Sequence, residues 1–244
     1  MPPPAAVIVS DAHLGFAPQA DAEAFHRFLA VVPDLGEHLV INGDLFEFFF
    51  AYRSVIPRAA LPTIEALRAL KTSGVRITLT GGNHDRWGND FWRDDLGIAF
   101  HPGAAELRLA GFATLVRHGD GLGESHWSSK VMHAVARRRL TSTIYRWIHP
   151  DLGLAMVRRL SPHLAGKAHD PEAVDRAARQ QRSRAEAILA ERPDIDVLVL
   201  GHTHRSQLVP VGERRWFLNP GAWVEGYRYA RLTEAGPVLE QFAG

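Results

Sequence analysis

The chain has 244 residues, a formal net charge of +1 and an ordinary apolar content, so it fits one α/β domain, alone or with an insertion. It contains no cysteine, which excludes disulfides and thiolate metal sites and leaves its 13 histidines as the nitrogen ligands that side chains can offer a metal. The near-neutral charge gives no support for general nucleic-acid binding, and no apolar run approaches the ~20 residues that span a bilayer.

In the first half of the chain, short apolar runs typical of buried strands alternate with segments of helical apolar spacing. The predicted strands cover residues 5–10, 38–41 and 75–80, and the predicted helices cover residues 21–32, ending before Pro33, and 62–74. Each strand is followed by polar residues able to bind a metal or move a proton. Asp11 and His13 point to the same side of an extended segment, because side chains alternate along a strand. The pattern predicts a polar site at the carboxyl edge of an α/β sheet.

The second half of the chain repeats this arrangement after a short predicted helix at residues 90–96. Further strands are predicted at residues 105–109, 112–117, 195–200, 207–211, 215–218, 227–232 and 238–242. His118 follows the second of these strands, and His202 and His204 follow the third. The last segments are expected to be closing antiparallel strands.

A segment of different character lies between these strands. Residues 125–167 hold eight lysines and arginines against Asp151 alone, a net charge of +7 in a chain whose total is +1. Their apolar residues fall at the spacing of short amphipathic helices, and a longer polar helix follows. The sequence therefore predicts a core in two parts, residues 1–122 and 193–244, with a helical cap inserted at residues 123–192.

The polar residues at the strand ends form a set of carboxylates, imidazoles and one amide, which suits Mn²⁺, Fe²⁺ or Zn²⁺. The set consists of Asp11, His13, Asp44, Asn83, His118, His202 and His204. Seven donors are too many for one ordinary site and fit two divalent ions that share a bridging carboxylate. We expect Mn²⁺ first, with Fe²⁺ or Zn²⁺ as alternatives. Two ions ~3.5–4 Å apart generate a hydroxide nucleophile and stabilise an in-line displacement at phosphorus.

The ligands divide naturally between the two ions. One ion is expected to take Asp11, His13 and His204, the other Asn83, His118 and His202, with Asp44 between them. The uncharged Asn ligand keeps the site from becoming too anionic to accept phosphate oxygens.

These motifs resemble those of the calcineurin-like metallophosphoesterase family. The matching blocks are Asp11-x-His13, Gly43-Asp44, Gly82-Asn83-His84-Asp85, His118 and Gly201-His202-x-His204, in the order that the family has. The resemblance implies an α/β sandwich of two mixed β-sheets flanked by helices, with the two-metal site at the strand ends. It also implies a catalytic role for His84, which would contact the scissile phosphate and assist the leaving oxygen while Asp85 orients it.

Within that family, the chain is similar to the UDP-2,3-diacylglucosamine pyrophosphatases of lipid A synthesis, in the sequences after four of its strands and in the place of the cap. This resemblance implies hydrolysis of a UDP-linked lipid to UMP and an acylated sugar 1-phosphate at the cytoplasmic face of the inner membrane. One position departs from it, because the best-known members have Arg where this chain has His84. Basic and apolar cap residues suit a diphosphate with acyl chains. The expected substrate-binding residues are Asp120, Trp127, Lys130, Arg137, Arg138 and Arg139.

Two other functions stay open at this point. A soluble nucleotide or small phosphoester would be the substrate if the cap residues pack among themselves, and a non-catalytic scaffold would keep the fold without the chemistry. A nuclease is disfavoured, because no basic stripe lies outside the cap. The first residues show no signal peptide, so we expect a cytoplasmic protein with peripheral membrane contact and no nucleic-acid partner.

Overall fold

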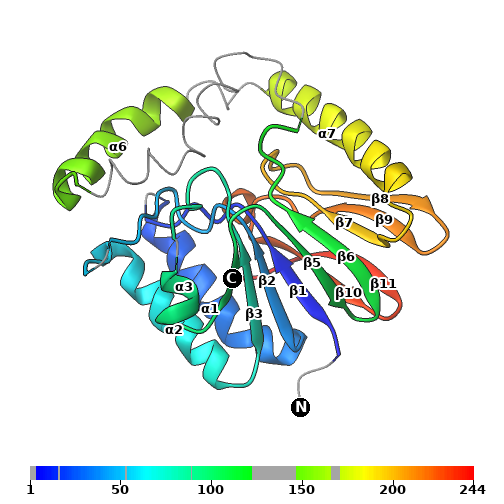
Figure 1. Ribbon diagram of the computed structural model, residues 1–244, viewed down its shortest axis with the longest axis horizontal. Coiled ribbons are helices and arrows are strands. Elements are labelled where there is room, and N and C mark those ends of the chain that lie inside the picture. Colours follow the sequence, from blue (N-terminus) through cyan, green and yellow to red (C-terminus); the bar gives the residue numbers. More distant parts are fainter. Residues whose placement is uncertain (1–3, 16, 53, 89, 123–146, 166–170) are drawn as a thin grey trace.

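The computed structural model describes residues 4–15, 17–52, 54–88, 90–122, 147–165 and 171–244. Two β-sheets lie at its centre (Figure 1). The first has six strands in the order β11-β10-β1-β2-β3-β4. Its strands are β1 (Ala6–Val9), β2 (His38–Asn42), β3 (Arg76–Thr80), β4 (Ala99–His101), β10 (Arg228–Thr233) and β11 (Gly236–Gln241). The strands from β1 to β4 are parallel, and β10 and β11 close the sheet antiparallel.

The second sheet has five strands in the order β5-β6-β7-β9-β8. They are β5 (Ala104–Leu109), β6 (Phe112–Arg117), β7 (Val197–Val199), β8 (Gln207–Gly212) and β9 (Arg215–Asn219). β6, β7 and β9 run parallel, whereas β5 and β8 pair antiparallel at the two edges. Both sheets are therefore mixed, and the predicted fold class is confirmed.

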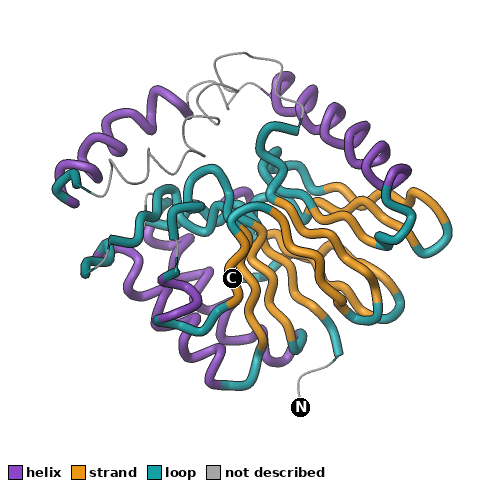
Figure 2. The backbone as a smooth tube through the Cα atoms, in the orientation of Figure 1, coloured by secondary structure: helices purple, strands orange, loops and turns teal. Residues whose placement is uncertain are grey.

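The two sheets pack face to face, and helices cover their outer faces (Figure 2). Ala6 and Ile8 of β1 point inward and join Val116 and Val199 of the second sheet in one buried cluster. Their neighbours in β1 point the other way, into a cluster with the helices, because strand side chains alternate between faces. This alternation explains why β1 is apolar at every position.

The helices on the six-stranded sheet are α1 (Gln19–Leu35) and α2 (Leu61–Thr72). α1 buries Phe25, Phe28 and Val32 against the sheet. The expected end of this helix before Pro33 is wrong by a few residues. Pro33 lies in the last turn, where its missing N–H removes one hydrogen bond without ending the helix, and the N–H of Gly36 still donates to the carbonyl of Val32.

The five-stranded sheet is covered by α7 (Pro171–Glu191), whose residues Ala185 and Leu189 are buried against Leu198 and Phe217. α7 falls within the segment predicted as the cap, although its inner face packs against the second sheet. The division of the chain into core and cap stays a prediction. α6 (Pro150–Ala165) lies apart from the sheets in Figure 1. In the part of the chain that is described, no helix is long and apolar enough to cross a membrane.

The described residues also form three short elements: η1 (Arg58–Ala60), α3 (Phe91–Asp94) and η2 (Trp223–Glu225). β4 was not expected from the sequence. Its three residues are too short to show an alternating pattern, and it forms through its parallel pairing with β3.

Candidate metal centre

The polar residues of the sequence motifs meet at the carboxyl ends of five strands from both sheets. Asp11 and His13 follow β1, Asp44 follows β2, and Asn83, His84 and Asp85 follow β3 in the first sheet; His118 follows β6, and His202 and His204 follow β7 in the second. The site therefore lies where the carboxyl edges of the two sheets come together.

Three overlapping groups of these residues place their ligand atoms within 4.8 Å of one another. The groups are Asp11, His13 and His204; His13, Asp44 and His84; and Asp44, His118 and His202. Asp44 belongs to two of them and links the first sheet to the second. This geometry is consistent with two neighbouring cations that share Asp44, with each ion supported by histidines.

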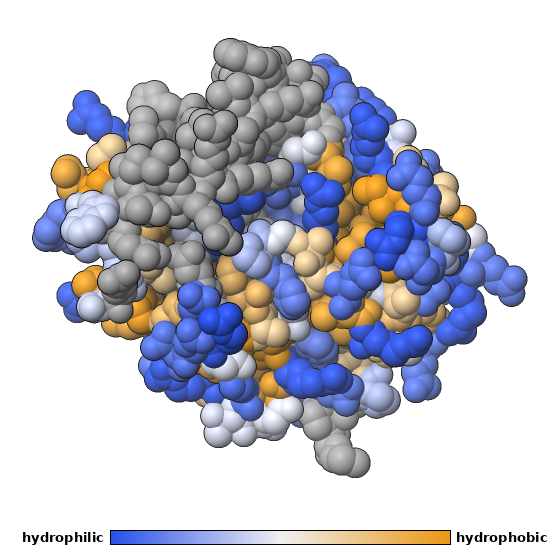
Figure 3. Space-filling model, viewed as in Figure 1, coloured by the Kyte–Doolittle hydropathy of each residue, from blue (hydrophilic) through white to orange (hydrophobic). Residues whose placement is uncertain are grey.

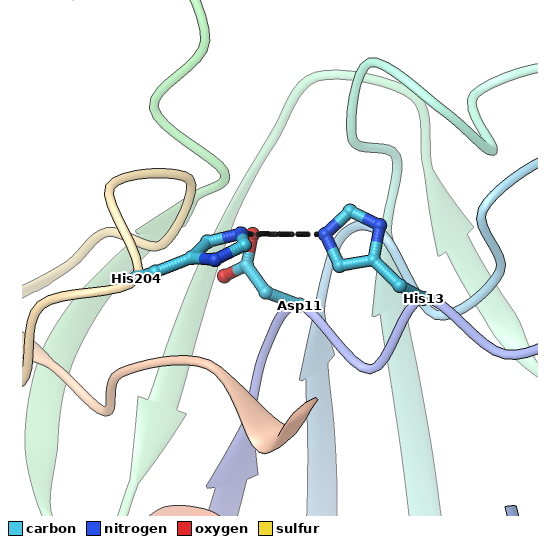
Figure 4. Close-up of side chains that lie close together, drawn as sticks. All are labelled: Asp11, His13 and His204. Carbon is cyan, nitrogen blue, oxygen red and sulfur yellow. Dashed lines mark hydrogen bonds and ion pairs between the residues drawn. The ribbon is translucent and has the colours of Figure 1, made fainter. Parts of the chain in front are cut away.

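The first group has the chemistry of a cation site (Figure 4). His13 lies with Nδ1 2.7 Å from a carboxylate oxygen of Glu47, and His204 lies with Nδ1 2.9 Å from one of Glu225. A carboxylate only accepts, so each Nδ1 carries a proton, and in the neutral ring each Nε2 presents a lone pair. The Nε2 atoms of His13 and His204 lie 3.3 Å apart, and Oδ1 of Asp11 lies 3.5 Å from Nε2 of His204. Three electron-rich atoms, the two Nε2 atoms and Asp11 Oδ1, then face one another, and a bound cation would stabilise this arrangement.

The third group, Asp44, His118 and His202, gives an independent test of fit. His118 is fully buried, and its Nδ1 donates to the carbonyl of Asn42 at 2.9 Å. Its Nε2 lies 3.0 Å from Asp44 Oδ2 but, within the described residues, makes no hydrogen bond. The buried Oδ1 of Asn83 likewise has no donor among those residues. Buried polar atoms are rarely left unpaired, so these two acceptors fit a second cation.

The electrostatics of the site also call for positive charge. Burial alone would raise the pKa of Asp11, but the adjacent His118 and His204 lower it overall. Burial alone would lower the pKa of His118, yet Asp44 and Asp11 raise it to about 10. His204 shows the same reversal, because its bonds to Asp11 and Glu225 overcome burial and raise its pKa to about 10. The carboxylates thus stabilise any cation here, whether a proton or a metal.

Glycine precedes several of these ligands because the strand ends approach too closely for a side chain. A Cβ at Gly82 would overlap Oδ1 of Asp44, and one at Gly43 would come within 2.5 Å of His118 Nδ1. A Cβ at Gly201 would overlap the hydroxyl of Ser10. Each glycine therefore makes room for a side chain that comes from a different strand.

Five ligand residues have a left-handed backbone. Their φ angles are 54° for Asp11, 47° for His13, 52° for Asp44, 70° for His202 and 59° for His204. Non-glycine residues seldom adopt this conformation, and Asp and His tolerate it better than most. Such strain persists where the surrounding structure fixes it. Here two amide contacts do so: the N–H of His13 donates to the carbonyl of Asp44, and the N–H of His202 donates to the carboxylate of Asp11.

A buried network behind the second sheet holds the loop that carries His202 and His204. Gln181 of α7 is fully buried and donates to the carbonyl of Gly201 at 2.7 Å. Its side-chain oxygen accepts from Thr203 at 3.0 Å and from Asn219 at 2.9 Å. Neither Gln181 nor Asn219 was expected from sequence, because nothing local in their segments marks a partner this distant in the chain.

Asp85 makes different contacts from those expected. Its carboxylate accepts from the backbone N–H groups of Gly82, Asp44 and Leu45 at 2.9, 3.3 and 2.7 Å, and it makes no hydrogen bond to the ring of His84. Burial and the nearby Asp44 raise its pKa to about 6. The expectation that Asp85 orients the imidazole is therefore corrected. Asp85 holds two ligand loops together through their backbones.

His84 is instead oriented by the chain after β2. Its Nδ1 donates to the carbonyl of Glu47 at 2.7 Å, and its Nε2 lies 3.9 Å from Asp44 Oδ2. About a third of the side chain is exposed, at 32%. His84 thus stands at the open side of the site, where a substrate can reach it.

Of the expected substrate-binding residues, Asp120 is described by the structure and the other five are not. Asp120 forms an ion pair with Arg86 at 2.7 Å, and both side chains are largely buried. Its carboxylate is thereby directed to a neighbour within the protein. Trp127, Lys130, Arg137, Arg138 and Arg139 lie outside the described residues.

An apolar pocket lies beside the metal ligands. It encloses about 310 Å³ and begins at Leu14 and Phe46, the neighbours in sequence of His13 and Glu47. Its walls are Leu14, Gly15, Phe46, Phe48, Tyr52, Val55, Ile56, Pro57, Arg58, Ala59, Ala60, Pro150, Asp151 and Leu154. The pocket thus joins the loop after β2 to α6. Figure 3 shows apolar surface at the end of the molecule where α6 lies, and Trp147, Leu152 and Met156 are exposed there.

Comparison with known proteins agrees with this geometry. The model of the family described as calcineurin-like phosphoesterase matches residues 6–206. A UDP-2,3-diacylglucosamine hydrolase of Porphyromonas gingivalis is 28% identical over 251 residues, which cover 95% of this chain and 95% of that protein. One of Xanthomonas oryzae pv. oryzae is 28% identical over 246 residues, covering 97% of this chain and 98% of that protein. A third, of Tolumonas auensis, is 26% identical over 211 residues, covering 83% and 80%.

Proposed function

The chain belongs to the calcineurin-like phosphoesterase family, and from that premise we propose that it hydrolyses the diphosphate of a UDP-2,3-diacylglucosamine-like lipid. The products would be UMP and an acylated sugar 1-phosphate. The family and the His/Asp groups already make the chain a metal-dependent phosphoester hydrolase. The lipid substrate is the finer step. It is supported by the names of relatives that match nearly the whole chain and by the pocket beside the ligands.

The protein groups have separate roles in this proposal. Asp11, His13 and His204 would hold one ion and Asn83, His118 and His202 the other, with Asp44 shared; Mn²⁺ is the ion that we propose. When bound, the ions supply a hydroxide nucleophile and neutralise charge on the phosphate. In this proposal His84, in its imidazolium form, would donate from Nε2 toward the leaving oxygen, while Nδ1 donates to the Glu47 carbonyl.

The observation that carries the lipid substrate is the pocket. Its volume of about 310 Å³ falls at the lower end of the range typical of small-ligand sites. Its walls are mainly aliphatic and aromatic, and Arg58 is the cation among the described residues that line it. A soluble sugar nucleotide has no apolar group of that size, whereas an acyl chain gains free energy by leaving water. Leu14 and Phe46 of its wall are the sequence neighbours of His13 and Glu47, so a chain linked to the sugar could reach the pocket from the ligands.

The proposed substrate resides in a membrane, so we propose that the protein works at the cytoplasmic membrane face. The exposed Trp147, just before α6, and Leu152 and Met156 of α6 are suited to contact with a lipid surface. The binding roles of Lys130, Arg137, Arg138 and Arg139 remain part of this proposal.

A direct assay decides between substrates. Mn²⁺-loaded protein is given UDP-2,3-diacylglucosamine, UDP-N-acetylglucosamine or bis-p-nitrophenyl phosphate. UMP from the two nucleotides is measured by mass spectrometry, and p-nitrophenol from the diester is measured by absorbance. We expect kcat/KM for the lipid to be at least roughly 10²-fold above that for the soluble sugar nucleotide. A ratio of this size corresponds to the free energy gained by burying about four methylene groups. Protein stripped with EDTA is the control. Equal rates on both nucleotides would favour a soluble substrate. If none of the three compounds is hydrolysed, the non-catalytic scaffold is favoured.

A further inference from the structure

Two carboxylates stand behind the histidines of one ligand group and were not among the expected site residues. Glu47 follows β2, and Glu225 ends η2, so they come from distant parts of the chain. Their oxygens lie 2.7 Å and 2.9 Å from Nδ1 of His13 and of His204. We propose that Glu47 and Glu225 are positioning residues that fix both rings with Nε2 toward the ion shared with Asp11. This rests on the proposed function only in requiring an ion at that place.

The contacts determine which ring nitrogen is free. Because each glutamate accepts a proton-bearing Nδ1, the neutral ring must present Nε2 as its lone pair. Both Nε2 atoms then point at one spot, 3.3 Å from each other and 4.0 and 3.5 Å from Asp11 Oδ1. Loss of a glutamate would free its ring to rotate or to change tautomer. A carboxylate partner also raises the basicity of the ligating nitrogen.

The two glutamates differ in exposure, which ranks their effects. The side chain of Glu47 is 17% exposed and that of Glu225 is 47% exposed. Water screens the more exposed pair, so Glu225 contributes less. Glu225 also lies 3.9 Å from Arg205, and a surface ion pair is the plain alternative for its role. His118, in the other group, is oriented by the uncharged carbonyl of Asn42. Removing the glutamate charges should therefore weaken the binding of one ion, the one held by His13 and His204, and leave the binding of the other unchanged.

Glu47 allows two roles to be separated in one residue. Its carboxylate contacts His13 at 2.7 Å and lies 3.7 Å from Nδ1 of His84, whereas its backbone carbonyl accepts from that Nδ1 at 2.7 Å. The backbone contact is the shorter of the two to His84 and is independent of the side chain. Glu47→Gln keeps the backbone contact and a side-chain acceptor, and removes the charge. The variant should thus change ion binding through His13 while leaving the orientation of His84 intact.

The test measures Zn²⁺ binding by the full-length protein after EDTA treatment, in competition with a chromophoric chelator. In Glu47→Gln we expect one of the two Zn²⁺ to bind about 10–100-fold more weakly and the other to be unchanged, and in Glu225→Gln a smaller loss at the same ion. Glu65→Gln is the matched control, because that carboxylate is 63% exposed in a surface pair with Arg68. Arg205→Gln should leave both affinities unchanged. ¹⁵N NMR of the Zn²⁺-loaded protein should show His13 and His204 with protonated Nδ1.

Each result decides the proposal. Wild-type affinity for both ions in Glu47→Gln and Glu225→Gln, or a protonated Nε2 on both rings, would overturn it. A loss in Arg205→Gln equal to that in Glu225→Gln would reduce Glu225 to a surface pair and overturn its role. If circular dichroism shows that Glu47→Gln does not fold, the more exposed Glu225→Gln decides alone. A wild-type protein that binds two Zn²⁺ without hydrolysing the UDP-lipid would defeat the proposed substrate and leave this inference standing.

Discussion

The metal centre and the apolar pocket beside it share a loop but are built in different ways. At the metal centre, buried ligands are held by directed hydrogen bonds, as with Asp11, Asp44 and His118. The pocket is closed by side chains of the loop after β2 and of α6, some of which are well exposed, as with Val55 at 47%. The metal centre should accept few substitutions, whereas the pocket wall should tolerate more of them. We therefore expect the strand ends to fix the chemistry and the more adjustable pocket wall to influence the choice of substrate.

The comparison is tested most severely by Asp44→Ala. Asp44 is the carboxylate common to two ligand groups, so both ions should be lost. We expect activity to fall by at least roughly 10⁴-fold, since metal stabilisation of the transition state is worth several kcal/mol. Elemental analysis and turnover of bis-p-nitrophenyl phosphate measure this, with the exposed Asp34→Ala as control. Full activity with one ion or none would refute the two-ion centre.

His84→Ala separates catalysis from ion binding. Its ring stands at the open side of the centre, so we expect kcat to fall by about 10²–10⁴-fold, as for loss of a general acid, while both ions stay bound. Steady-state kinetics and metal content give the two readouts. His84 also groups with His13 and Asp44 within ligand distance. Loss of an ion in the variant would therefore make it a ligand and contradict the catalytic role.

Gly82→Ala tests how tightly the centre is packed without removing any ligand. Its Cβ would overlap Asp44 Oδ1, so Asp44 must move, and we expect ion binding to weaken by about 10–100-fold, as when an outer contact of a ligand is lost. Chelator competition measures the change. Gly103→Ala is the matched control, because its Cβ would meet nothing within 4 Å. If both variants bind ions equally well, the centre is less constrained than its geometry indicates.

The smallest effect is expected in the pocket. Leu154→Asp places a charge on the pocket wall, and we expect KM for the UDP-lipid to rise about 10-fold, the value of one buried leucine. Hydrolysis of bis-p-nitrophenyl phosphate should not change. Leu152→Asp is the control, since that side chain is 58% exposed on the same helix and is absent from the pocket wall. Equal effects of both variants would mean that α6 acts through general contact with lipid.

The sequence predicted the strands and the ligand groups because both signals are local. A buried strand such as β1 is a continuous apolar run, and a ligand follows it within a few residues. Helix ends and the short strand β4 were less predictable, since tertiary pairing decides them. Contacts between distant segments outside the ligand motifs could not be predicted. Nothing near Glu225 or Gln181 indicates that their partners are His204 and the loop at Gly201.

Asp85 shows why a motif is not a contact map. The family resemblance implied that it orients His84, but the side chains of these two neighbours point in different directions. Its carboxylate lies under the loops and accepts from three backbone N–H groups. The ring of His84 meets a carbonyl from another strand end instead. The residue types were informative about chemistry, and the structure was needed to pair them.

The left-handed backbone at five ligand positions limits how this centre can change in evolution. Asp, Asn and His are the side chains, glycine aside, that tolerate such a conformation best. They are also good ligands for a divalent ion. A mutation to Val, Ile or Thr at Asp11 or His202 would meet a steric penalty before any loss of chemistry, because branching at Cβ clashes with that backbone. Neutral drift is therefore confined to a small set of residues that already bind metal, so the centre can exchange one ion for another more easily than it can lose its ligands and keep its shape.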